Sequence, residues 1–220
     1  MKNETPVVTV SSAPYLRLIP VLIIATLMAF CPTLTRADTI AFSFIDGGTH
    51  IGAANTTAGY AFTLSSPVNV TELGVWDLGN DGLLESHLVT IWTSTGTQEA
   101  QGTVPSATGG TLTNGFRYVS IAPVLLPAGS YTIGTFFPDT ADLVATLNSS
   151  ITPASGVTYD DSRIGLGNAF PSGQVIVREN SFFGPNFQFT TATSVPDTGM
   201  TCSLFGLSFM GLAFLRRKLC

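Results

Sequence analysis

The sequence predicts an all-β domain, a β-sandwich of jelly-roll type, set between two apolar segments near the ends of the chain. Short runs rich in Val, Ile, Thr and aromatic residues recur roughly every dozen residues, and Gly, Pro, Asn and Asp separate them. Apolar and polar side chains alternate in Leu88–Trp92 and Tyr131–Gly134, and no stretch of the domain has the 3.6-residue period of a long helix. Many short strands in one domain favour a sandwich.

The N-terminal segment, residues 1–37, is typical of a secretory signal peptide. Lys2 and Arg17 precede an apolar core from Leu18 to Phe30. Small residues then stand at the positions that signal peptidase reads, which predicts cleavage between Ala37 and Asp38. An uncleaved N-terminal anchor is the alternative.

Residues 38–192 form the predicted β-domain. This segment and the short linker after it carry twelve acids and three arginines, with no lysine and no cysteine, so the formal charge is about −9. Such a surface repels nucleic acid and anionic lipid. The expected strands are Thr39–Phe44, Tyr60–Leu64, Val68–Trp76, Leu88–Thr93, Gln98–Thr103, Phe116–Ile121, Ser130–Phe137, Leu143–Asn148, Val157–Tyr159, Gln174–Arg178 and Asn186–Thr191.

The loop from Asp77 to Gly82 holds the main candidate ligand side chains of the domain. Asp77, Asn80 and Asp81 offer hard oxygen ligands of the kind that Ca²⁺ prefers, so a structural Ca²⁺ is one interpretation. The other interpretation is a turn that uses Asn, Asp and Gly because these residues accept positive φ. His87 with scattered carboxylates does not make a catalytic triad, and we expect it at the edge of a strand, bonded to backbone. The sequence therefore predicts no enzyme.

Aromatic residues divide into a predicted core set and a candidate binding pair. Trp76 and Trp92 fall within strands, where large rings usually fill the core. Phe182 and Phe183 precede Gly184-Pro185 in a predicted loop, and we expect them to be exposed and able to stack on a glycan. The adjacent acids Asp160 and Asp161 are expected to point to opposite faces of a strand.

The middle of the domain resembles a known type of module. The runs Leu73–Trp76, Ser86–Trp92, Phe116–Val119 and Leu126–Tyr131 are similar to a β-sandwich module of exported PEP-CTERM-type proteins. They are also similar to carbohydrate-binding-module-like domains of bacterial surface proteins. The resemblance covers residues 68–135 and implies architecture more than activity.

The C-terminal tail has three parts. Residues 193–199 form a linker and the motif Val195, Pro196, Asp197, Thr198 and Gly199. Residues 200–220 hold an apolar run with a basic end, Arg216, Arg217 and Lys218, which acts as a cytoplasmic membrane stop. The run predicts a transmembrane helix, somewhat short for a full span.

This tail resembles the PEP-CTERM class of bacterial sorting signals, in its VPDSG variant. The resemblance implies cleavage by an exosortase, a membrane-embedded cysteine transpeptidase, and export to the envelope or extracellular matrix of a bacterium that makes exopolysaccharide. We therefore expect an exosortase-processed envelope or matrix protein with a structural or adhesive β-sandwich, transiently anchored in the membrane. The alternative is a carbohydrate-binding module that recognises an exopolysaccharide or another glycan. The expected partners are signal peptidase, exosortase and exopolysaccharide.

Overall fold

The computed structural model describes residues 37–147, 150–174 and 183–192, and every regular element in these ranges is a β-strand. The predicted all-β class is confirmed for this part of the chain. The strands are β1 (Thr39–Ile40), β2 (Phe42–Ile45), β3 (Thr49–Gly52), β4 (Thr56–Leu64), β5 (Val68–Trp76), β6 (His87–Thr93), β7 (Gln98–Val104), β8 (Thr111–Thr113), β9 (Phe116–Leu126), β10 (Gly129–Phe137), β11 (Leu143–Leu147), β12 (Ser150–Pro153), β13 (Val157–Leu166), β14 (Gly173–Gln174) and β15 (Pro185–Thr191).

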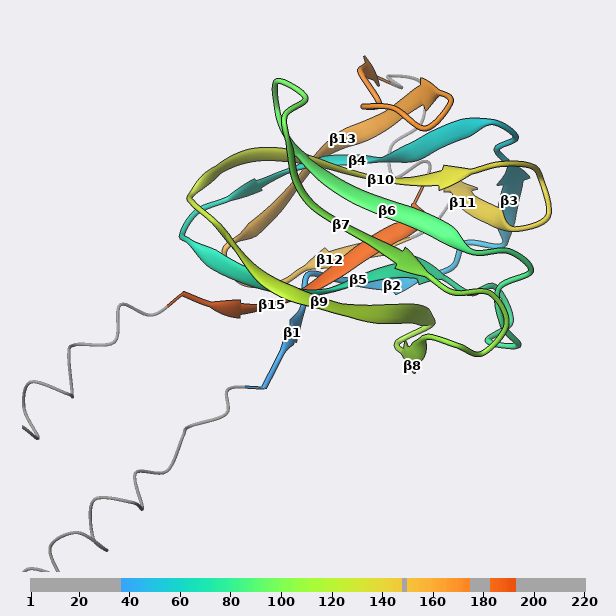
Figure 1. The fold of residues 1–220 in the computed structure, drawn as a ribbon, viewed down its shortest axis with the longest axis horizontal. Coiled ribbons are helices and arrows are strands. Elements are labelled where there is room, and N and C mark those ends of the chain that lie inside the picture. Colours follow the sequence, from blue (N-terminus) through green and yellow to red (C-terminus); the bar gives the residue numbers. More distant parts are fainter. Residues whose placement is uncertain (1–36, 148–149, 175–182, 193–220) are drawn as a thin grey trace, which may run out of the picture. The chain divides into compact units, whose positions relative to one another are not determined.

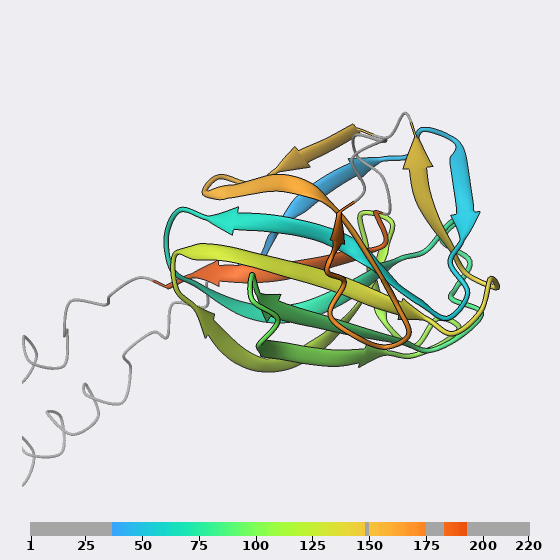
Figure 2. The same cartoon turned by 90° about the horizontal axis from the view of Figure 1, so that it is seen from above.

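Two large antiparallel sheets form the body of the domain (Figures 1 and 2). One sheet has the strand order β1-β15-β5-β9-β8, and the other has the order β14-β13-β4-β10-β6-β7. Two small sheets, β11-β3 and β12-β2, flank them. This arrangement establishes antiparallel sheets but not the jelly-roll type, which stays a prediction.

The core lies between the two large sheets and is rich in aromatic rings. In β4, Tyr60, Phe62 and Leu64 are buried and face inward because alternate residues of a strand share a face. From the opposite sheet, Phe187 of β15 lies 4.9 Å from the Phe62 ring centroid. Burying a side chain of this size stabilises the fold by about 1.5–3 kcal/mol, so these rings account for much of its stability.

Both ends of the described domain lie at the same end of the sheets. Thr39 of β1 pairs with Phe189 of β15, next to where β15 ends. The small β3–β11 sheet lies at the opposite end (Figure 1). The chain therefore enters and leaves the domain at one end, and the loops before β6 and β11 lie at the other.

Several strand boundaries differ from those predicted. The segment expected as one strand, Thr39–Phe44, is two strands separated at Ala41. The Ala41 amide donates to Phe187 (2.9 Å) and its carbonyl accepts from Ala154 (2.8 Å). Ala41 is therefore the residue at which the chain leaves the five-stranded sheet and pairs with β12 instead.

The strand expected at Val157–Tyr159 extends as β13 to Leu166. A bulge after Tyr159 breaks the apolar–polar alternation on which the shorter prediction depended. The strand expected at Leu143–Asn148 ends at Leu147, and of the one expected at Gln174–Arg178 the structure describes only Gln174, the end of β14. The remaining residues of those two predictions lie outside the described ranges.

Candidate functional site

The loop after β5 is built around a buried ion pair between Asp77 and Arg117. The Arg117 Nε atom donates to Asp77 Oδ2 at 2.7 Å, and both side chains are almost fully buried. The Gly82 amide donates to both Asp77 carboxylate oxygens, at 3.2 and 3.1 Å. The Asp77 carboxylate, the first of the predicted Ca²⁺ ligands, is thus engaged by groups of the protein itself.

Backbone oxygens complete the surroundings of the Arg117 guanidinium. Its two terminal nitrogens donate to the carbonyls of Gly110 (3.4 Å) and Asn80 (3.1 Å). Asn80 has a φ of 62°, which Asn adopts more readily than most residues. The turn interpretation therefore accounts for Asn80. The Asp77 carboxylate and the Asn80 backbone carbonyl face a cation that belongs to the chain, the Arg117 guanidinium.

The other predicted ligand side chains, those of Asn80 and Asp81, are exposed. Among the described residues, no three or more His, Asp or Glu side chains are grouped in a way that could hold a metal ion. The structural Ca²⁺ remains a sequence-based hypothesis, and its first ligand already has a partner.

His87 opens β6 and is buried, with only 1% of its surface exposed. Its Nδ1 atom lies 3.0 Å from the carbonyl oxygen of Phe136, as expected for a strand-edge histidine bonded to backbone. Its Nε2 atom lies 2.7 Å from Asp142 Oδ2. The sequence did not indicate this second contact, because 55 residues separate the two side chains.

Asp142 fastens one loop to another. Its two carboxylate oxygens accept the backbone amides of Leu84 and Glu85, each at 3.0 Å, in addition to the His87 ring. Burial opposes the charge of Asp142, but these hydrogen bonds outweigh it, so the pKa of Asp142 lies below its ordinary value. Both ring nitrogens of His87 are engaged, which leaves neither available to activate a nucleophile.

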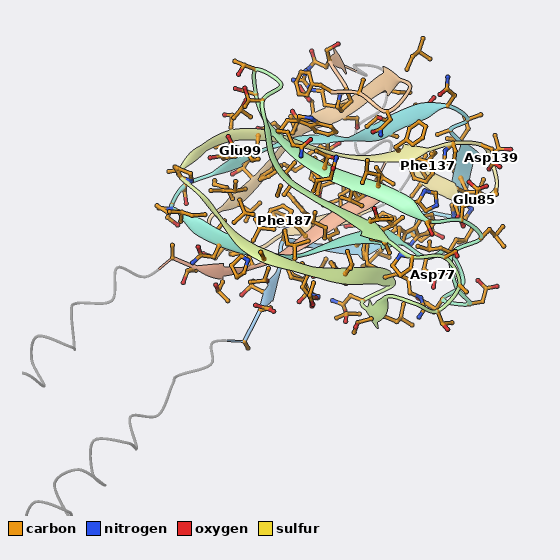
Figure 3. All side chains as sticks on the ribbon, viewed as in Figure 1. Asp77, Glu85, Glu99, Phe137, Asp139 and Phe187 are labelled. Atoms are coloured by element: carbon orange, nitrogen blue, oxygen red, sulfur yellow. The ribbon has the colours of Figure 1, made fainter. Side chains whose placement is uncertain are left out.

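Glu85 has the opposite shift. Burial, and then the charge of Asp139 and a hydrogen bond with it, raise the pKa of Glu85 above its ordinary value. Figure 3 shows Glu85 and Asp139 close together at the end of the molecule. Two carboxyl groups in contact favour a shared proton, because like charges at short range cannot both ionise easily.

The expected exposure of Phe183 is wrong. Phe183 is fully buried, and its ring stacks on Tyr60 with a centroid distance of 4.9 Å and an interplanar angle of 3°. A ring in this position cannot stack on a glycan at the surface. Phe182, the other half of the candidate pair, lies outside the described residues.

The expected burial of the two tryptophans is confirmed, in two different places. Trp76 is 6% exposed and belongs to the core between the sheets. Trp92 is 7% exposed, but it lies on the outer face of the six-stranded sheet, where the Phe170 ring covers it at 5.9 Å. Neither indole therefore forms an open platform.

The expectation that Asp160 and Asp161 point to opposite faces is also wrong. The bulge between Tyr159 and Asp161 interrupts the alternation. Asp160 accepts a hydrogen bond from Thr63, which points to the outer face, and Asp161 pairs with Arg163 on that same face. Each carboxylate is thus engaged with a side chain of its own sheet.

The processing signals fall mainly outside the described residues. Of the predicted signal peptide only Ala37 is described, and Ala37 and Asp38 are both exposed just before β1. The sorting motif, the membrane stop and the predicted transmembrane run all lie beyond residue 192. A search of the described ranges finds no helix with the length and hydropathy needed to cross a membrane.

Comparison with known proteins finds a match for the C-terminal tail but none for the β-domain. Residues 194–219 match the VPDSG-CTERM motif, a variant of the PEP-CTERM-type sorting signal. No curated protein and no solved structure matches the chain. A C-terminal signal of this class indicates an exosortase-sorted, exported protein associated with the cell envelope. The resemblance of the tail to this class is therefore confirmed.

Proposed function

We propose that this chain is a structural or adhesive protein of the envelope or extracellular matrix, displayed among exopolysaccharide after removal of its two terminal signals. The observation that carries the proposal is the VPDSG-CTERM motif at residues 194–219, which begins shortly after Thr191, the end of the last strand in the described ranges, β15. The processed product is then little more than the β-domain and a short linker.

The position of the chain ends supports display of one end of the domain. Asp38, the predicted new N-terminus, directly precedes β1, and β1 pairs with β15. The described domain therefore begins and ends at the same end of its sheets. A domain attached there presents the opposite end, with the loops before β6 and β11, to its surroundings.

The side chains of the described residues favour a structural role over catalysis or glycan stacking. Every aromatic ring in the described ranges is buried or half-buried, so these ranges hold no exposed ring for a sugar face. His87, the buried histidine, has both ring nitrogens engaged. These features support a non-enzymatic domain whose surface is acidic.

Fractionation of the native host tests the proposal. We expect the wild-type protein in the envelope or matrix fraction, without its tail. A Pro196→Ala, Asp197→Ala variant should keep its C-terminal tail and stay in the membrane fraction, because the processing enzyme no longer recognises the motif. The same distribution and mass for both proteins would contradict the sorting step. An unchanged matrix in a strain that lacks the gene would contradict the structural role.

A glycan array separates the alternative function, a carbohydrate-binding module. The processed protein recovered from the host is the sample. Saturable binding to one glycan class, lost in Phe182→Ala while the circular dichroism spectrum is kept, would favour the module. Phe183→Ala is unsuitable for this purpose, because the loss of a buried ring would disturb the fold itself.

A further inference from the structure

Two pairs of titratable side chains, His87 with Asp142 and Glu85 with Asp139, lie where the β5–β6 loop touches the β10–β11 loop. Glu85 and His87 lie on one side, and Asp139 and Asp142 on the other; we call this group the loop latch. Asp142 directly precedes β11, which pairs with β3. The contact between these loops therefore also holds the small β3–β11 sheet in place at the end of the domain.

The hydrogen bonds of His87 fix how many protons the latch holds. Nδ1 faces the Phe136 carbonyl, which can only accept, so this nitrogen carries a hydrogen. Nε2 faces Asp142, whose carboxylate already accepts two backbone amides. A second hydrogen must therefore lie between Nε2 and Asp142 Oδ2. With Asp142 ionised, both contacts are hydrogen bonds at the same time only if each ring nitrogen of His87 carries a hydrogen.

Loss of that proton turns one attractive contact into a repulsive one. If Nε2 keeps its hydrogen, the Nδ1 lone pair faces the Phe136 carbonyl. If Nδ1 keeps its hydrogen, the Nε2 lone pair faces the Asp142 carboxylate. His87 is buried, so water does not easily replace the lost hydrogen bond, and an unsatisfied buried acceptor is costly.

The neighbouring Glu85 responds to pH in the same direction. A group whose pKa is raised on folding contributes stability at low pH and loses it as the pH rises through the folded pKa. Glu85 is such a group. The lowered pKa of Asp142 sets the acidic limit of the latch. The stability that ionised Asp142 contributes is lost only when the pH falls through its lowered pKa in the folded state.

We propose that Glu85, His87, Asp139 and Asp142 form a proton-dependent latch, which fastens the β10–β11 loop to the β5–β6 loop at mildly acidic pH and loosens as the pH rises. The neighbours that β10 and β7 place against His87 are uncharged: the Phe137 ring lies 4.8 Å from the His87 ring, and Val104 pairs with His87. The four named groups therefore set the response.

Nitrogen-15 NMR of the full-length protein, labelled only in its histidines, tests the proton count directly. The chain has two histidines, and a His87→Gln variant assigns their signals. We expect both ring nitrogens of His87 to carry a hydrogen at pH 5.5. A singly protonated His87 at that pH would overturn the proposal.

Hydrogen exchange of the Leu84 and Glu85 amides, which donate to Asp142, reports the opening of the latch. After correction for the intrinsic exchange rate, we expect their protection to fall about tenfold between pH 5.5 and pH 8.5, the size expected for one buried hydrogen bond. Amides paired between β5 and β15 should not change. Equal protection of Leu84 and Glu85 at the two pH values would refute the latch.

Two variants separate the latch from general alkaline destabilisation. His50→Gln removes the second histidine, whose pair with Asp46 is more exposed, and it should leave the pH response intact. Asp142→Asn should abolish the pH response of the Leu84 amide, because the new NH2 group can donate to a neutral Nε2 while Nδ1 still donates to Phe136 and Oδ1 still accepts Leu84. The Glu85 amide loses its acceptor in this variant, so it is not compared. If the Asp142→Asn variant kept the wild-type pH response, that response would not come from the His87–Asp142 contact, and the latch would be refuted.

Discussion

Arg117 and Asp77 show how a residue pair can replace an expected ligand site. In the sequence, the oxygen-bearing residues of the Asp77–Gly82 loop suggest a metal site. In the structure, the Arg117 guanidinium supplies the positive charge that faces the Asp77 carboxylate. This pair links the end of β5 to the start of β9, 40 residues later. Neither the partner of Asp77 nor that of His87 could be predicted, because pairing at this sequence distance depends on the register of strands.

Removal of Arg117 tests the importance of the buried pair. Arg117→Met leaves the Asp77 carboxylate buried without a counter-charge, and we expect the free energy of unfolding to fall by about 3–5 kcal/mol in urea titrations. Arg163→Met is the matched control, because its pair with Asp161 is partly exposed (26% and 21%) and should be worth about 1 kcal/mol or less. Equal losses in both variants would show that the Asp77–Arg117 pair has no special weight.

Phe183 offers a second test at the residue scale. Its ring fills the core against Tyr60, so Phe183→Ala should lower the free energy of unfolding by about 3–5 kcal/mol through the cavity that it leaves. Leu166→Ala, at a side chain that is 85% exposed, should change it by about 0.5 kcal/mol or less. A mild effect of Phe183→Ala would mean that the ring is not held in the core.

The strands differ in how well their sequences reveal them. β5, β6, β10 and β15 carry apolar or aromatic residues at regular alternation, and they lie close to where the sequence predicts them. β3, β8 and β12 are short and partly polar, and the start of β4 reads Thr-Thr-Ala-Gly, so these were missed. Their pairing depends on the neighbouring strand rather than on their own residues.

Gly59 in β4 tests this dependence on neighbours. A Cβ atom at Gly59 would overlap the backbone of Ile133 and come within 2.8 Å of Gly134 Cα, both in β10. We expect Gly59→Ala to lower the free energy of unfolding by about 1–3 kcal/mol, because one strand must shift. A Gly102→Ala control meets only flexible side-chain ends, at 3.0 Å or more, and should cost less. The reverse order would contradict the close approach of β4 and β10.

At the scale of the whole molecule, the fold class and the destination signal could be predicted, but the sites could not. The all-β class follows from composition and alternation, and the tail is a contiguous motif. The latch and the buried ion pair arise only when distant loops meet at one end of the sheets. No amount of local pattern contains that information.

A chelator experiment tests whether the stability of the whole protein depends on a bound metal ion, or whether the buried Asp77–Arg117 pair takes its place. Because Arg117 supplies the cation of the Asp77 loop, we expect EDTA to leave the Tm unchanged in a buffer that contains no added metal. Excess Ca²⁺ should not raise the Tm either, since a bound ion would stabilise the folded state by mass action. A rise in Tm with Ca²⁺ that EDTA reverses would restore the structural-ion hypothesis.

The account depends most on processing at both ends of the chain, and the intact mass of the protein from its native host tests it directly. We expect a mature chain that begins at Asp38 and lacks everything after Thr198 or Gly199, with peptide mapping to confirm each end. Any added mass on the new C-terminus would identify what the domain is attached to. A chain that still ends at Cys220 would contradict the proposed sorting and leave a protein that keeps its tail.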